Sequence, residues 1–188
     1  MAYMNDDEMK NMGFRSLGNN VKISAKASIY NCDQIEIGDN SRIDDYCIIS
    51  GKIQIGRHVH VTPMCLIAGG KKGIIIGDFV TMAYGVKVFT QSDDYSGETM
   101  ANSTVPKKYK NEYKNCIAIK KHTIIGAGSI IMPGVTLAEG VSIGAMTLVL
   151  KNTEPWSIYV GVPAKKIKNR SKNLLNLEAY FLKNNDSI

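Results

Sequence analysis

Residues 37–67 read IGDNSRIDDYCIISGKIQIGRHVHVTPMCLI, and this stretch decides the fold. An aliphatic residue returns at every sixth position without a break: Ile37, Ile43, Ile49, Ile55, Val61 and Ile67. A helix would place apolar residues three and four apart, and a half-buried surface strand would alternate strictly. Neither pattern has a period of six, so the segment is an internal repeat whose unit is a hexapeptide.

The same period extends in both directions from this stretch. Towards the N-terminus, across a slip of two residues, it occupies Leu17, Ile23 and Ile29. Towards the C-terminus a short insert, GGKKG at 69–73, precedes three more positions, and a long insert then separates these from a second regular run. The positions are Ile76, Met82 and Val88, followed by Ile119, Ile125, Ile131, Leu137, Ile143 and Val149.

Two positions of each hexapeptide are predicted to point inward. The position four residues after each aliphatic anchor holds a small or β-branched residue, as at Ser41, Cys47 and Val59. Short β-branched segments suit strands, and the intervening Gly, Asn and Asp tolerate the positive φ of a sharp corner. Stacked copies of such a unit bury one continuous core. The repeat therefore predicts an all-β protein, a prism-shaped parallel β-helix.

The breaks in the period divide the chain into three parts. Residues 1–16 form a polar lead-in, and residues 17–153 form the β-helix. Residues 89–118 are too polar and aperiodic for a coil and are predicted to be a long inserted loop, which in a compact domain is usually functional. Residues 154–188 form an exit segment, in which the spacing of Leu174, Leu177 and Phe181 predicts a short C-terminal helix.

The second run carries a resemblance to a known family. The segment IIGAGSIIMPGVTLAEGVSIGAMTLVLKNTEPWSIYVGVPAKKIKNR (124–170) is similar to the last coils and exit of the hexapeptide-repeat acyltransferases, with GVPAKKI its most specific part. The resemblance covers residues 17–170 and implies a left-handed β-helix that uses acetyl-CoA. Within the family the chain most resembles sugar O-acetyltransferases of the maltose, galactoside and surface-polysaccharide type. It therefore implies acetyl transfer to a hydroxyl of a sugar or a polysaccharide precursor.

Composition limits the alternatives. The chain has 188 residues, 44% hydrophobic and 21% charged, as in soluble globular domains. Met1–Leu17 lacks the apolar run of a secretory signal, and no eighteen apolar residues stand together, so we expect a cytoplasmic protein without membrane insertion. The four cysteines follow no metal-ligand spacing. The net charge of +6 lies largely near the C-terminus without interleaved aromatics, which argues against nucleic acid and favours a polyanionic cofactor.

A base is needed to take a proton from an acceptor hydroxyl, and histidine is the usual one. His58 and His122 fall at the corner position of the repeat, where we expect solvated side chains. His60 falls on an outward strand position and is the predicted base. The resemblance aligns the family's catalytic histidine with Asp93, which departs from the family pattern. We therefore expect Asp93 or Asp94 to orient His60 or the substrate, or Asp93 to replace the histidine as base.

The resemblance also implies a set of positions that bind acetyl-CoA in a groove between adjacent prisms. Small residues let the thin pantetheine chain approach the backbone, and lysines meet the CoA phosphates as point charges. The predicted cofactor-binding residues are Ala127, Ala145, Leu150, Lys151, Lys165 and Lys168. The last two stand where the family has arginines, so the bidentate geometry of a guanidinium is lost.

The acceptor is assigned to the inserted loop. The predicted substrate-binding residues are Tyr95, Ser96, Glu98 and Asn102. An N-acetyltransferase acting on an amino-sugar nucleotide is the alternative within the same chemistry. Remote alternatives are a zinc protein like the γ-type carbonic anhydrases, which needs three convergent histidines, and a non-catalytic scaffold. No metal site is predicted.

The outward positions of the coils predict an assembly. They include Ile48, Leu66, Ile124, Ile130 and Leu148, which are too apolar for a fully hydrated prism. The resembled family closes its active sites between three subunits. Together these points predict a homotrimer.

Overall fold

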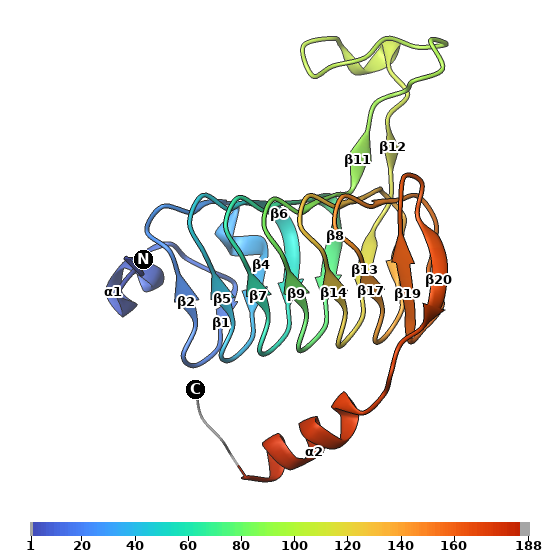
Figure 1. Ribbon diagram of the computed structural model, residues 1–188. Helices are drawn as coiled ribbons and strands as arrows, with labels where there is room; N and C mark the ends of the chain where they lie inside the picture. The colour runs from blue at the N-terminus through green and yellow to red at the C-terminus, as the bar shows by residue number, and fades with distance from the viewer. Residues whose placement is uncertain (1, 185–188) are drawn as a thin grey trace.

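The computed structural model describes residues 2–184. The chain winds into a β-solenoid of about seven turns with a C-terminal helix lying below it (Figure 1). The hexapeptide β-helix predicted from the sequence is confirmed. Every aliphatic anchor from Ile37 to Val149 is at most 2% exposed, because the coils above and below cover it. Leu17 and Ile29, in the first coil, are only partly buried, since no coil precedes them.

Three faces make up the prism, and we number them in the order in which a coil passes through them. Face 1 is the parallel part of the eight-stranded sheet. Its strands are β2 (Lys22–Ile23), β5 (Arg42–Ile43), β7 (His60–Val61), β9 (Thr81–Met82), β14 (Ile124–Ile125), β17 (Ser142–Ile143) and β19 (Ser157–Val160). Equivalent residues pair from coil to coil, as Arg42 does with His60.

Faces 2 and 3 form one ten-stranded sheet, because two long strands run around the corner between them. These are β6 (Ile48–Ile55) and β8 (Leu66–Ile76), the latter containing the GGKKG insert. Face 2 also has β3 (Ser28–Tyr30), β10 (Lys87–Phe89), β15 (Ile130–Ile131) and β18 (Leu148–Val149). Face 3 also has β1 (Ser16–Leu17), β4 (Ile35–Ile37), β13 (Ile117–Ile119) and β16 (Thr136–Leu137).

We name each corner by the faces that it joins. Corner 3/1 holds residues in the left-handed backbone region, as its sharp turn requires; they are Asn20, Asn40, His58, Phe79, His122 and Trp156. Corner 1/2 is the stack of turns that contains Tyr46, Met64, Tyr84 and Met146, joined by backbone hydrogen bonds from coil to coil. Corner 2/3 contains Gly51 and the GGKKG insert.

The inserted loop leaves the prism at corner 2/3 and covers residues 90–116. The coil continues one residue further than predicted before the loop and resumes at Ile117. Two short strands, β11 (Gln91–Ser92) and β12 (Tyr113–Lys114), pair antiparallel as a stem that rises from the prism (Figure 1). A 3-10 turn, η2 (Lys107–Tyr109), lies in the distal part. The loop thus projects from the prism and is joined to it by this two-stranded stem.

Segments near both ends of residues 2–184 pack against the prism. Helix α1 (Asp6–Asn11) begins with a capping box between Asn5 and Glu8, and the 3-10 turn η1 (Cys32–Gln34) lies in the first coils. The parallel sheet extends past the predicted end of the coils at residue 153, because β19 pairs with β17. Strand β20 (Lys165–Asn169) then folds back antiparallel on β19, and α2 (Leu174–Asn184) runs along corner 3/1.

The predicted terminal segments 1–16 and 154–188 extend outside the described residues at position 1 and at positions 185–188. Within residues 2–184, no helix is long and apolar enough to cross a membrane.

Candidate active site

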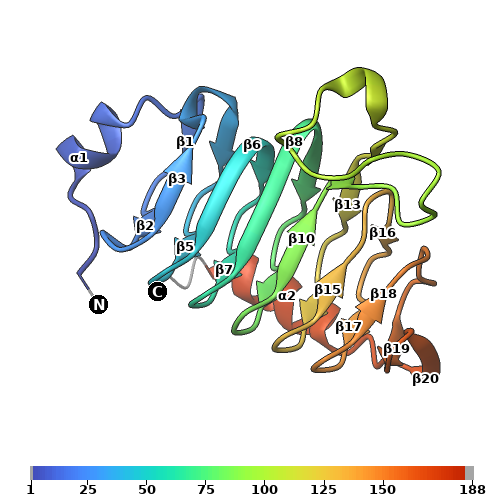
Figure 2. The ribbon, with the colours of Figure 1, turned by 90° about the horizontal axis from the view of Figure 1, so that it is seen from above.

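Asp93 and Asp94 follow directly after the first strand of the loop stem. The register of the stem pairs Gln91 with Lys114 and Ser92 with Tyr113, so the two aspartates begin the part of the loop beyond the stem. Figure 2 shows this part of the loop at one edge of face 2, beside β10 and β13. The carboxylates are therefore presented at the border of face 2 and are half-buried.

Asp94 organises the loop. Its Oδ1 accepts hydrogen bonds from the backbone N and the hydroxyl of Ser96, at 2.8 and 2.6 Å. Its Oδ2 accepts two more from the backbone N and the hydroxyl of Thr99, at 3.1 and 2.7 Å. The donors on Ser96, then those on Thr99, favour the charged carboxylate and lower the pKa of Asp94 to about 2. A carboxylate with that pKa is a weak base but a durable anion.

Asp93 is much less engaged than its neighbour. Its Oδ2 accepts one long hydrogen bond, 3.4 Å, from the backbone N of Asn102. Asn102 in turn accepts from Thr104 through its own side chain. Of the predicted acceptor residues, Ser96 and Asn102 therefore hold the loop together, and Tyr95 and Glu98 are exposed. Of the two adjacent aspartates, Asp93 is the one with capacity left for a ligand.

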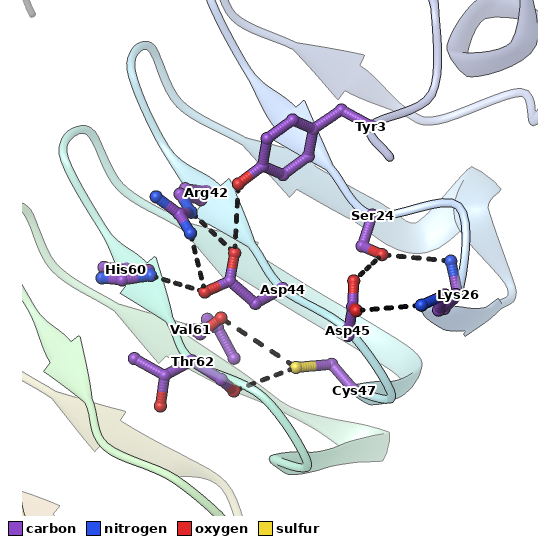
Figure 3. Close-up of polar contacts among 10 residues, drawn as sticks. All are labelled: Tyr3, Ser24, Lys26, Arg42, Asp44, Asp45, Cys47, His60, Val61 and Thr62. Carbon is purple, nitrogen blue, oxygen red and sulfur yellow. Dashed lines mark hydrogen bonds and ion pairs between the residues drawn. The ribbon is translucent and has the colours of Figure 1, made fainter. Parts of the chain in front are cut away.

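His60 lies on face 1 and pairs with a carboxylate that the sequence analysis missed (Figure 3). Its Nε2 is 2.9 Å from Oδ2 of Asp44, whose side chain is 2% exposed. We expected Asp93 or Asp94 to orient His60, but within one chain it is Asp44 that contacts the His60 ring. The parallel register brings His60 beside the preceding coil of face 1, whereas the loop leaves from corner 2/3.

Asp44 is the centre of a small charged cluster. Burial opposes its ionisation, but the hydrogen bond from Arg42, at 2.6 Å, and the contact with His60 outweigh it and lower the pKa of Asp44. Tyr3 approaches Oδ1 at 3.5 Å (Figure 3). One signal in the sequence marks this site: the position after the face 1 anchor is Ser24 and Thr62 in the neighbouring coils, and only this coil has a carboxylate there.

His58 and His122 lie at corner 3/1 as predicted, but His122 is not solvated. It is 7% exposed, and its Nε2 is 2.8 Å from Oε2 of Glu178 on α2. Phe79 stacks between the two histidine rings, with ring centroids 4.9 Å from His58 and 5.3 Å from His122. Phe181 of α2 covers this stack from outside. The expectation of solvation is wrong for His122 because α2 returns along the corner.

The predicted cofactor residues lie at the C-terminal end of the prism, around corner 1/2, after β18 and on β20. Ala127 and Ala145 stack at corner 1/2, where the backbone N of Met146 donates to the carbonyl of Ala127 at 2.8 Å. Leu150 and Lys151 are exposed directly after β18. The turn before β20 is tied to β18, because the N of Ala164 donates to the carbonyl of Leu148. This end of the prism thus offers small residues, one apolar side chain and exposed cations.

Lys165 and Lys168 lie on β20 and are exposed. Neither has an ion pair among the described residues, whereas Lys166 pairs with Glu154. Their charge is available to an anionic ligand.

An apolar ridge runs along corner 1/2. Its members are each more than half exposed: Tyr46, Met64, Tyr84, Met146 and Val162. Ile48 and Ile124, two of the predicted outward positions, are also exposed, and the other three are partly covered. Exposed apolar side chains that gather along one corner are typical of an interaction surface.

Within residues 2–184, no group of three or more His, Cys, Asp and Glu side chains could hold a metal ion. Cys47 and Cys65 are buried free thiols inside the prism.

The chain is similar to several known acyltransferases. The family model of the bacterial transferase hexapeptide (six repeats) matches residues 34–69. The chain is 45% identical over 184 residues to the dTDP-4-amino-4,6-dideoxy-D-glucose acyltransferase of Escherichia coli, covering 96% of this chain and 95% of that protein. AntD, an N-acyltransferase from Bacillus cereus solved with dTDP and 3-hydroxybutyryl-CoA, is 45% identical with a TM-score of 0.97, covering both chains completely.

The comparisons overturn the predicted hydroxyl acceptor. AntD was also solved, as a variant, with dTDP-4-amino-4,6-dideoxyglucose and coenzyme A. A maltose O-acetyltransferase from Clostridium difficile, the type that the sequence resemblance favoured, is only 23% identical with a TM-score of 0.59, covering 90% of this chain and 80% of that one. That likeness extends to the fold alone. The last coils and GVPAKKI, which carried the resemblance, indicated the hexapeptide-repeat family as a whole and not its acceptor.

Proposed function

This chain belongs to the hexapeptide-repeat acyltransferases, which use acyl-CoA, and on that premise we propose that it N-acylates dTDP-4-amino-4,6-dideoxyglucose. The observation that carries the proposal is the 45% identity, over nearly the whole of both chains, to the E. coli acyltransferase named for that sugar nucleotide. The amino-sugar alternative thus replaces the polysaccharide hydroxyl as acceptor.

The chemistry of the loop supports an amine. An amino group with a pKa near that of an α-amino group, about 8, keeps a neutral nucleophilic fraction near pH 7. A hydroxyl does not, so it depends on a strong base. Asp93 stands where the resembled O-acetyltransferases have their catalytic histidine. An amine acceptor depends less on that strong base than a hydroxyl acceptor does. A carboxylate at this position instead holds the ammonium and orients the amine as it loses its proton.

The reaction balances without a further reagent. The neutral amine nitrogen attacks the thioester carbonyl, an N–C bond forms and the C–S bond breaks. The proton that leaves the nitrogen ends on the departing thiolate, so the products are the amide and free CoA. We assign Asp93 to the amino group and Asp94 to the turn that positions it. The alternative base is His60, whose Nε2 donates a hydrogen bond to Asp44 that orients the ring in the manner of a general base.

The acyl-CoA site is assigned to the C-terminal end of the prism, at Ala127, Ala145, Leu150, Lys151, Lys165 and Lys168. Small side chains at corner 1/2 leave room for pantetheine, and the two lysines of β20 supply unpaired positive charge for phosphates. The apolar ridge beside this site supports a homotrimer in which a neighbouring subunit closes the groove.

One assay tests the proposed function. Purified protein is incubated with dTDP-4-amino-4,6-dideoxyglucose and either acetyl-CoA or 3-hydroxybutyryl-CoA, and thiol release and product mass are followed. A blank without acceptor corrects for the exposed thiol of Cys116. We expect thiol release and an acylated sugar nucleotide, and none with dTDP-glucose, which has a hydroxyl in place of the amine. Acylation of dTDP-glucose at an equal rate would contradict the proposal.

A further inference from the structure

A cavity of about 460 Å³ lies at corner 2/3, under the stem of the inserted loop. Its volume falls within the range of small-molecule sites, roughly 300–1,000 Å³. It is lined almost entirely by glycines, amides and lysines: Asn31, Gln34, Gly51, Gly70, Lys71, Lys72, Thr90, Gln91 and Lys114. None of these residues has a part in the site described above.

The GGKKG insert builds the floor of this cavity. It lengthens β8 so that the strand passes around corner 2/3 and pairs Gly70 with Gly51 of β6. A Cβ on Gly51 would lie 2.5 Å from the backbone N of Gly70, so a side chain cannot be placed there without moving the strand. Gly70 itself has a φ of +49°. The floor at these two positions is therefore bare backbone, and a Cβ on Gly70 would lie 3.1 Å from the hydroxyl oxygen of Thr90.

The roof of the cavity belongs to the inserted loop. Thr90 is 2% exposed, and its hydroxyl donates to the carbonyl of Gly69 at 2.7 Å. Gln91 and Lys114, paired across the stem, both line the cavity. Asp93 follows Gln91 by two residues. Two residues that line the cavity, Thr90 and Gln91, are thus close in sequence to the carboxylate that we assign to the acceptor.

The charge of the cavity is positive and only partly compensated. Lys114 and Lys110 both pair with Glu112, whose side chain is 13% exposed. Gln91 donates to the same carboxylate at 2.7 Å. Lys71 and Lys72 are exposed and have no ion pair among residues 2–184. Two free ammonium groups over bare backbone suit a compact anion with several oxygens.

We propose that the GGKKG cavity binds the diphosphate of the nucleotide-linked acceptor; the identity of that acceptor rests on the proposed function. The connection to the acceptor loop favours this source over the phosphates of CoA. The lysines assigned to CoA, Lys165 and Lys168, lie on β20 in the other sheet. The diphosphate anchors the nucleotide at corner 2/3, and the sugar extends towards Asp93.

Calorimetry with dTDP, thymidine and CoA tests the assignment. The variants are Lys71→Ala/Lys72→Ala and, keeping polar side chains only one atom shorter, Lys71→Gln/Lys72→Gln. The matched control, Lys10→Ala/Lys120→Ala, removes the same charge from exposed lysines elsewhere. Both cavity variants should raise the Kd of dTDP about tenfold or more, as expected for losing charge-assisted hydrogen bonds, and leave CoA binding unchanged. Thymidine, without phosphate, should bind all the proteins equally.

The outcomes separate the cavity from the proposed function. An unchanged Kd for dTDP in both cavity variants, with normal folding by circular dichroism, would overturn the assignment. If the cavity variants lose CoA binding and keep dTDP binding, the phosphates bound in the cavity belong to CoA and the assignment to the acceptor is wrong. If wild-type protein fails to acylate the amino sugar yet binds dTDP in a lysine-dependent way, the proposed function fails and the cavity stands.

Discussion

The Nε2 of His60 lies 2.9 Å from Oδ2 of Asp44 across two neighbouring coils of face 1. Arg42 approaches the same carboxylate from its own strand, at 2.6 Å. The three side chains come from one turn of the prism and the next, because the parallel register stacks equivalent positions. The contact between these two coils therefore depends on the buried carboxylate of Asp44 being ionised.

Asp44→Ala should destabilise the fold by about 1–3 kcal/mol, the usual cost of leaving donors to a charged group unsatisfied. Because the folded pKa of Asp44 is lowered, its contribution is fully present above the unfolded value of about 3.9 and is lost as the pH falls through the folded pKa. Urea unfolding at fixed protein concentration, between pH 7 and pH 3, measures both effects. Asp33→Ala, at an exposed carboxylate, is the control. A difference in unfolding free energy that stays constant down to pH 3 would contradict this account.

Asp93→Asn should lower kcat/KM for the amino-sugar acceptor by about a hundredfold, the lower range for a positioned catalytic group. His60→Gln should lower it less than about fivefold, because His60 lies on face 1, away from the loop. Steady-state thiol release measures both, with Glu139→Gln, an exposed carboxylate at corner 3/1, as the control. The reverse order, a large loss for His60→Gln and a small one for Asp93→Asn, would identify the His60–Asp44 pair as the base.

Lys165→Ala/Lys168→Ala should weaken acyl-CoA binding about tenfold at low salt, with a smaller effect at high salt because exposed charges are screened. Both side chains are exposed on β20, so the urea midpoint should not move. Titration of CoA at two ionic strengths measures the effect, and Lys10→Ala/Lys120→Ala is the charge-matched control. Equal affinities of wild type and variant at both ionic strengths would show that these lysines serve another ligand.

The apolar ridge of corner 1/2 should bury itself in a homotrimer. Light scattering is expected to give three times the 20.6 kDa of one chain. Met64→Glu/Met146→Glu should dissociate the assembly, because two unpaired carboxylates would be buried at the contact. Ile75→Glu places one such carboxylate on an exposed apolar position of face 3, outside the ridge, and should leave the assembly intact. A wild-type monomer at micromolar concentration would remove the intersubunit groove from the proposal.

The amino-acid sequence determined the coils almost completely. The anchors of the period are the buried residues, and the positions predicted at the corners adopt the left-handed backbone conformation that corners need. This success has a local cause. In a stacked repeat each residue meets its equivalents in the adjacent coils, so its environment follows from its place in the hexapeptide.

Only the tertiary structure decided the contacts that leave this register. His122 is buried because Glu178, 56 residues later, returns on α2, and no periodicity encodes where that helix lies. Asp44 pairs with His60 because two coils stack, although the sequence favoured the aspartates of the loop. The cavity at GGKKG exists because Thr90 joins the loop stem to an insert about twenty residues earlier in the chain. A repeat fixes which side chains face inward, whereas the docking of helices, loops and inserts depends on contacts between distant segments.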